Sequence, residues 1–107
     1  MSQEDFDKKV EQLISINDSK ELWCFTVTTQ GLNYNRVIEY YINAKDSFYL
    51  EELVSAMSDE LDQEYLVDKM IGTKDKNFIK EALLYCNKSM QYSMNQKLLE
   101  KLLDYVK

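Results

Sequence analysis

Apolar side chains recur at helical spacing in the N-terminal part of the chain. Phe6, Val10 and Leu13 follow one another at steps of four and three residues, which places them on one face of a helix. Ser2 precedes this run as a potential N-cap, because a serine hydroxyl can accept a hydrogen bond from a free N–H of the first turn. The pattern therefore predicts an amphipathic helix over residues 3–16.

Residues 22–29 follow a different pattern. Trp23, Phe25 and Val27 alternate with smaller or polar residues, and aromatic and β-branched side chains at a period of two are typical of a half-buried strand. Residues 36–43 fit either a return strand or a helix. We favour the β-hairpin, because a single strand would leave its backbone N–H and C=O groups without partners.

Beyond residue 45 the apolar residues return to helical spacing. A first predicted helix follows a cap at Asp46 or Ser47 and extends to Met57. A second begins at Ser58, and Gly72 is expected to end it in the left-handed conformation.

Two more helices are predicted towards the C-terminus. One follows a cap at Thr73 or Asp75 and extends to about Met90. The other opens with Ser93-x-x-Gln96, which has the spacing of a capping box.

These patterns predict one compact domain over residues 1–107. Its fold class is α+β, predominantly α, with about five helices and one β-hairpin near residues 22–43; the alternative is an all-α helical bundle. The chain has no proline and two glycines, which favours long helices, and no internal repeat is visible. A chain of 107 residues is long enough to bury one core without disulfide or metal support.

The chain contains no histidine and two cysteines, Cys24 and Cys86, which lack the C-x-x-C spacing of a zinc or redox site. Catalysis by Ser-His or Cys-His pairs and metal binding by histidine are therefore excluded. The remaining carboxylates, lysines and tyrosines do not have the spacing of a known catalytic site. We expect a protein that is not an enzyme and has no cofactor and no metal site, with both cysteines as buried free thiols.

Hydropathy indicates where in the cell the protein is located, and composition indicates the type of genome that encodes it. No apolar run approaches the roughly 18 residues of a membrane-spanning helix, and the N-terminus is acidic. We therefore expect a cytoplasmic protein with no membrane contact. Asparagine, lysine, isoleucine and tyrosine are frequent and Arg36 is the only arginine, which suggests an AT-rich bacterial or phage genome.

Charge is segregated along the chain, whose formal net charge is −6. Residues 46–68 hold eight acids and no base, whereas residues 69–107 hold four acids and eight lysines. Like charges three or four positions apart on a helix repel by about 0.2–0.5 kcal/mol per pair, so folding alone does not explain the cluster. A solvated face is one interpretation, partly neutralised by the C-terminal lysines and partly favoured by the dipole at a helix start.

The functional hypothesis is that this acidic face docks on a basic surface of a partner protein. In a sharper form, the protein comes from a phage or mobile element and its row of carboxylates mimics the charge of nucleic acid. The predicted partner-binding residues are Glu51, Glu52, Asp59, Glu60, Asp62 and Glu64.

The last predicted helix carries an apolar stripe that is wide for a chain terminus. The stripe either packs into the core or forms a homodimer interface. An alternative function follows from the second interpretation: a small dimeric DNA-associated regulator that uses the lysine-rich C-terminal half. A net charge of +4 spread over residues 69–107 is ordinary, and this and the single arginine argue against direct nucleic-acid binding. The residues of the stripe are Leu98, Leu99, Leu102, Leu103 and Val106.

Overall fold

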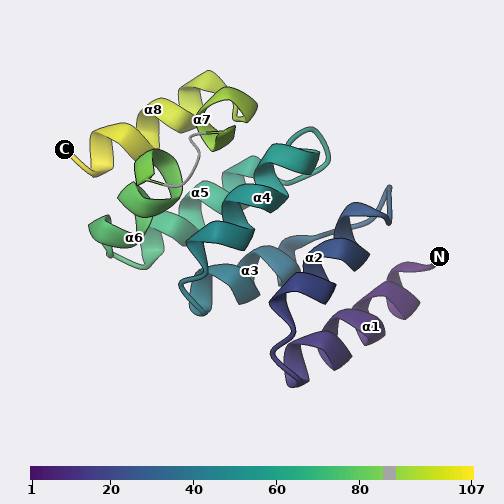
Figure 1. The fold of residues 1–107 in the computed structure, drawn as a ribbon. Coiled ribbons are helices and arrows are strands. Elements are labelled where there is room, and N and C mark those ends of the chain that lie inside the picture. Colours follow the sequence, from purple (N-terminus) through teal and green to yellow (C-terminus); the bar gives the residue numbers. More distant parts are fainter. Residues whose placement is uncertain (86–88) are drawn as a thin grey trace.

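The computed structural model describes the backbone of residues 1–85 and 89–107 and the side chains of residues 1–84 and 90–107, and every regular element in this part is a helix (Figure 1). The predicted α+β fold with a hairpin near residues 22–43 is therefore wrong, and the all-α alternative fits. The elements are α1 (Gln3–Ser15), α2 (Ser19–Val27), α3 (Asn35–Asn43), α4 (Ser47–Met57), α5 (Gln63–Gly72), α6 (Lys76–Lys80), the π-helix η1 (Glu81–Tyr85), α7 (Ser89–Ser93) and α8 (Gln96–Tyr105).

The first predicted strand forms helix α2. Leu22 and Thr26, four residues apart, are both fully buried, and the Thr26 hydroxyl donates a hydrogen bond to the Leu22 carbonyl at 2.7 Å. Trp23 and Val27 pack against the core from the sides of the helix, because α2 contacts α1, α3 and α4. A helix covered on several sides is apolar on most of its circumference, and this pattern imitates the alternation of a strand.

The predicted return strand forms helix α3. Its buried residues are Val37, Ile38, Tyr41 and Ile42, which is the helical grouping of the alternative interpretation. The Tyr41 hydroxyl donates to the carbonyl of Ser19 at 2.7 Å, which ties α3 to the start of α2.

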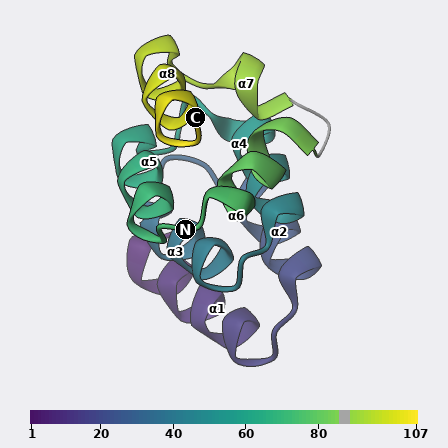
Figure 2. The same ribbon diagram turned by 90° about the vertical axis from the view of Figure 1, so that its left-hand side faces the viewer.

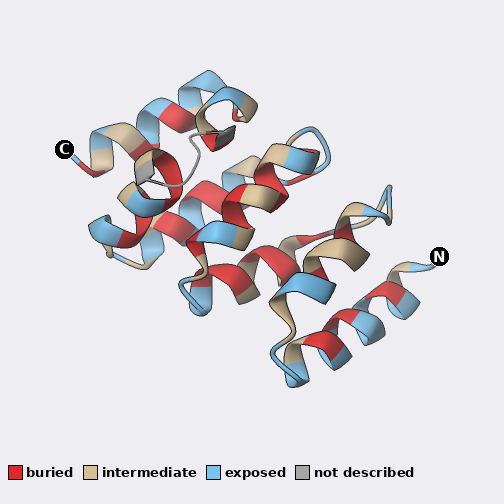
Figure 3. Ribbon diagram, in the orientation of Figure 1, coloured by how far each residue is buried: buried red, intermediate tan, exposed pale blue. Residues whose placement is uncertain are grey.

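The helices form two layers. In one layer α1 contacts α3, α3 contacts α5 and α5 contacts α8; in the other α2 contacts α4, and α4 contacts η1 and α7. Figure 2 shows α5 and α8 on one side and α2, α4 and α7 on the other. The stack extends for 40 Å from α1 to α8 (Figure 1), and buried residues lie on the inner sides of its helices (Figure 3).

One tight turn recurs three times between the layers. Each copy has a residue in the left-handed conformation, followed by an aspartate that caps the next helix through its side chain. The left-handed residues are Asn17 (φ 54°), Lys45 (φ 56°) and Lys74 (φ 56°), 28 and 29 positions apart. The caps are Asp18, Asp46 and Asp75, which accept the N–H groups of Glu21, Tyr49 and Phe78.

The sequence shows no repeat, but the fold is a stack of helical hairpins, as in α-solenoids. Two hairpins are α1–α2 and α3–α4, and the third turn joins α5 to α6. Because Lys74 is the left-handed residue of the third turn, the prediction that Gly72 ends α5 in this conformation is wrong. The sequence signature of each turn is two residues long, which is too short to be seen as a repeat.

Several predicted boundaries are also corrected. Residues 58–62 connect α4 to α5, and the cap of α5 is Asp62 rather than Ser58. The helix predicted to extend to Met90 is divided into α6, η1 and α7, and Asn95 caps α8 in place of Ser93. By contrast, the caps predicted at Ser2, Asp46 and Asp75 are confirmed.

The recurring turns form one edge of the stack, where an ion pair joins the second turn to the third. The ammonium of Lys45 lies 3.2 Å from a carboxylate oxygen of Asp75 and 5.2 Å from the centre of the Phe78 ring. The N–H of Phe78 and the ammonium of Lys45 lower the pKa of Asp75, because both stabilise its ionised form.

Three other connections form the opposite edge, the connector edge, made of residues 28–34, 58–62 and 94–95. The N–H of Gly31 donates to Glu60 at 3.2 Å, and the N–H of Asn95 donates to Gln63 at 2.7 Å. Gln3 exchanges hydrogen bonds with Asn33, which brings the start of α1 to the same edge. In the described part of the chain, no helix is long and apolar enough to cross a bilayer.

Candidate functional site

The structure separates the six predicted partner-binding carboxylates. Glu51 is fully buried within α4, and Glu52 beside it is half-buried. The other four are exposed and lie together in the α4–α5 connection and the first turn of α5. We call these four residues the acidic connector: Asp59, Glu60, Asp62 and Glu64.

Two residues of the acidic connector have local structural roles. Glu60 accepts the N–H of Gly31, and Asp62 accepts the N–H of Tyr65 at 3.0 Å as the N-cap of α5. Within the described residues, the side chains of Asp59 and Glu64 accept no hydrogen bond. Asp62 and Glu64 are also favoured by the dipole at the start of α5, which explains part of the clustering without a partner.

Several cations of the chain pair with carboxylates outside the acidic connector. Lys101 lies 3.4 Å from Asp68, and Lys69 lies 4.0 Å from Glu39. Within residues 1–84 and 90–107, no lysine or arginine forms an ion pair with the acidic connector. The C-terminal lysines therefore neutralise Asp68 but leave the connector's charge uncompensated in this part of the protein.

Arg36 organises a second charged cluster on the layer of α1, α3 and α5. Its guanidinium donates to Glu11 at 2.6 Å and to Glu39 at 3.1 Å, and the Tyr65 hydroxyl donates to Glu39 at 3.3 Å. The hydrogen bond with Glu11 raises the pKa of Arg36 despite partial burial. Lys69 also lies beside Glu39, so two cations meet two carboxylates, and we interpret the cluster as a clamp between helices.

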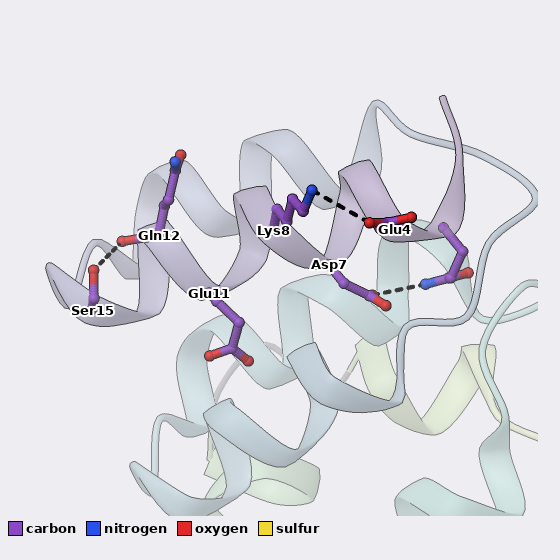
Figure 4. Close-up of a pocket in the computed structure, with 7 residues that line it drawn as sticks. Glu4, Asp7, Lys8, Glu11, Gln12 and Ser15 are labelled. Carbon is purple, nitrogen blue, oxygen red and sulfur yellow. Dashed lines mark hydrogen bonds and ion pairs between the residues drawn. The ribbon is translucent and has the colours of Figure 1, made fainter.

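Three of the hollows that the described residues form lie on this layer, and none of these three encloses a set of catalytic groups. A cleft of about 460 Å³ lies between α1 and α3, and one of about 450 Å³ lies between α3 and α5. The third hollow is lined by α1 alone (Figure 4). There Lys8 pairs with Glu4 at 3.4 Å, so polar side chains of one helix bond one another. A polar outer face of this kind suits the end of a helical stack.

The apolar stripe of α8 lies against the rest of the protein. Leu99, Leu102 and Val106 are 5%, 0% and 7% exposed, and Leu98 and Leu103 are half-buried against the core. The surplus apolar surface on which the homodimer hypothesis depended is therefore largely covered within the chain.

Sequence reasoning missed the burial of Glu51. One carboxylate oxygen, Oε1, accepts the Ser55 hydroxyl at 3.0 Å, whereas Oε2 is buried and has no hydrogen-bond partner among the described residues. The signal was the helical position of Glu51, one turn after buried Ser47 and next to Leu50.

The sequence also predicted two buried free cysteines and no metal site. Cys24 is a free, half-buried thiol, and Cys86 lies outside the described residues. No group of three or more potential metal ligands occurs within the described residues. Comparison with protein-family models, curated proteins and solved structures finds no match to this chain.

Proposed function

We propose that this protein is a non-enzymatic docking protein whose acidic connector binds a basic surface of a partner protein. The observation that carries the proposal is the set of four exposed carboxylates within six residues, with no cation paired to them in the described part of the chain. Such a patch attracts a basic surface at long range and fixes its orientation on contact. By occupying that surface, the protein regulates or inhibits its partner.

The partner class we propose is a nucleic-acid-binding protein, because such proteins present lysine and arginine clusters to phosphates. A protein that docks on such a surface resembles nucleic acid in its negative charge alone. The alternative function, a DNA-associated regulator using the C-terminal lysines, has less support. Lys69, Lys101 and Lys107 each pair with a carboxylate, and Lys76 lies over the Tyr105 ring.

The test is a capture experiment from lysate with a charge-reversal variant of the connector. Asp59→Lys combined with Glu64→Lys changes the two carboxylates that accept no hydrogen bond in the described structure, so the fold is expected to survive. Glu51 is excluded, because a lysine at this position would bury an unpaired charge.

The matched control combines Glu21→Lys with Glu81→Lys, two exposed acids on α2 and η1. Both variants raise the net charge by the same amount, so a general charge effect would appear in both. We expect the connector variant to lose a basic protein that the wild type and the control retain. Equal loss in both variants, or retention by the connector variant, would contradict the proposal.

A further inference from the structure

The cleft between α1 and α3 contains a carboxylate that the clamp around Arg36 does not use. This cleft of about 460 Å³ is lined by Gln3, Asp7 and Glu11 of α1, by Asn33 of the connection between α2 and α3, and by Arg36. Figure 4 shows Asp7 and Glu11 pointing to the same side of α1. Glu11 pairs with Arg36 at 2.6 Å, but within the described residues no cation pairs with Asp7. The charge of Asp7 is therefore left uncompensated by the residues that line the cleft.

Hydrogen bonds hold the acceptor groups of this cleft in place. The side-chain amide of Gln3 donates to Asp7 at 2.9 Å and to the Asn33 carbonyl at 3.1 Å. Oε1 of Gln3 accepts the N–H of Asn33 at 2.8 Å, and Oδ1 of Asn33 accepts the N–H of Asn35 at 2.9 Å. Each of these two amide oxygens has a second lone pair, and the Asp7 carboxylate has a second oxygen. The cleft thus presents several acceptors to a ligand that brings donors.

The cleft is next to the acidic connector. Asn33 lies two residues after Gly31, whose N–H donates to Glu60 at 3.2 Å. Two residues of backbone span at most about 7 Å, so the contact with Glu60 lies close to the wall of the cleft. Asp7 follows Gln3 by one helical turn, and Gln3 bonds Asn33 at the same edge. The uncompensated carboxylate of the cleft and those of the connector therefore belong to neighbouring parts of one surface.

We propose that this cleft is an arginine subsite of the docking surface, in which an arginine of the basic partner pairs with Asp7. A guanidinium carries five N–H donors in one plane, so it can bond Asp7 and the oxygens of Gln3 or Asn33 together, whereas a lysine ammonium acts as a point charge. Arg36 does not fill this role, because Glu11 and Glu39 engage its guanidinium. This inference rests on the proposed function, and it adds the kind of side chain that the partner inserts.

Calorimetric titration with two synthetic peptides tests the subsite. Both peptides carry a lysine cluster, a flexible glycine–serine spacer and one further residue, which is arginine in one peptide and its uncharged analogue citrulline in the other. We expect the wild type to bind the arginine peptide about fivefold more tightly than the citrulline peptide. Asp7→Asn keeps the shape of the side chain and an acceptor for Gln3, and it should remove this preference. Equal affinities of the two peptides for the wild type would overturn the inference.

The matched control is Asp5→Asn. It removes an exposed carboxylate of the same helix that does not line the cleft, so the variant should keep the preference for the arginine peptide. Both substitutions lie at exposed positions, and circular dichroism checks that both variants are folded before the titration. A preference that survives Asp7→Asn, or one that Asp5→Asn removes as well, overturns the arginine subsite.

The connector variant separates this inference from the proposed function. Asp59→Lys with Glu64→Lys should weaken the binding of both peptides and keep the preference for arginine. If this variant weakens both peptides and Asp7→Asn keeps the wild-type preference, connector docking stands and the arginine subsite is wrong. If the connector variant binds both peptides as the wild type does and Asp7→Asn removes the preference, the subsite stands and connector docking is wrong.

Discussion

Replacing Glu51 by methionine should stabilise the protein. The substitution removes the hydrogen bond from the Ser55 hydroxyl to Oε1, which is worth about 1 kcal/mol. Ser55 keeps an acceptor, because its hydroxyl also donates to the backbone carbonyl of Glu51 at 2.9 Å. In return, Oε2 disappears, and its burial without a partner among the described residues costs about 1–3 kcal/mol.

Methionine adds apolar contacts in a side chain of similar length and favours a helix about as well as glutamate does. We therefore expect Glu51→Met to raise the free energy of unfolding by about 1–2 kcal/mol, which corresponds to about 5–10 °C in Tm for a domain of this size. Urea unfolding followed by far-ultraviolet circular dichroism and by the fluorescence of Trp23 measures the change, with the m-value unchanged.

The control is Glu21→Met, which replaces an exposed glutamate and should change the free energy of unfolding by no more than about 0.5 kcal/mol. A loss of more than about 1 kcal/mol in Glu51→Met would refute the reasoning. It would mean that a cation pairs with Glu51 in the folded protein.

Three further substitutions test the fold. Leu102→Ala should lower the free energy of unfolding by about 2–5 kcal/mol in urea titrations, because Leu102 is fully buried; a change below about 1 kcal/mol would mean that α8 does not pack in the core. The N–H of Phe78 and the ammonium of Lys45 lower the pKa of Asp75 from its ordinary value of 3.8. The interactions of the Asp75 carboxylate therefore stabilise the fold above that pH and are lost as the pH falls through the lowered pKa. Asp75→Asn should therefore be less stable than the wild type at neutral pH and lose less stability on acidification, and parallel curves from urea titrations over a pH series would contradict this. Tyr41→Phe should cost about 1 kcal/mol through the lost hydrogen bond to Ser19, and urea titrations should give the same loss at about pH 6 and 9, because burial raises the pKa of Tyr41.

Helices with one apolar face could be predicted from the sequence. Helix α1 has Phe6, Val10 and Leu13 buried and a polar outer face, so its period is visible. The same holds for α8, where Leu99 and Leu102 are buried beneath polar residues. In both cases the helix closes one end of the stack, and one side remains in water.

The inner helices could not be predicted in the same way. Helix α2 is covered by three neighbours, so the sequence around Trp23 carries no clear period of 3.6. In α3 the residues Ile38 and Ile42 are shared by the strand and helix interpretations, and only tertiary packing decides between them. The cluster of acidic residues at 46–68 was visible in the sequence. Sorting its members into exposed Asp59 and buried Glu51 required the arrangement of the helices around α4.

The most direct test of the account is the affinity of the captured partner, measured by calorimetry at roughly 0.05 and 0.5 M salt, where the screening length changes about threefold. We predict that the wild type and the Glu21→Lys/Glu81→Lys control bind with similar affinity at low salt and weaken together at high salt. The Asp59→Lys/Glu64→Lys variant should bind weakly at both. Equal affinities for the wild type and this variant at low salt would contradict the claim that the acidic connector is the docking surface.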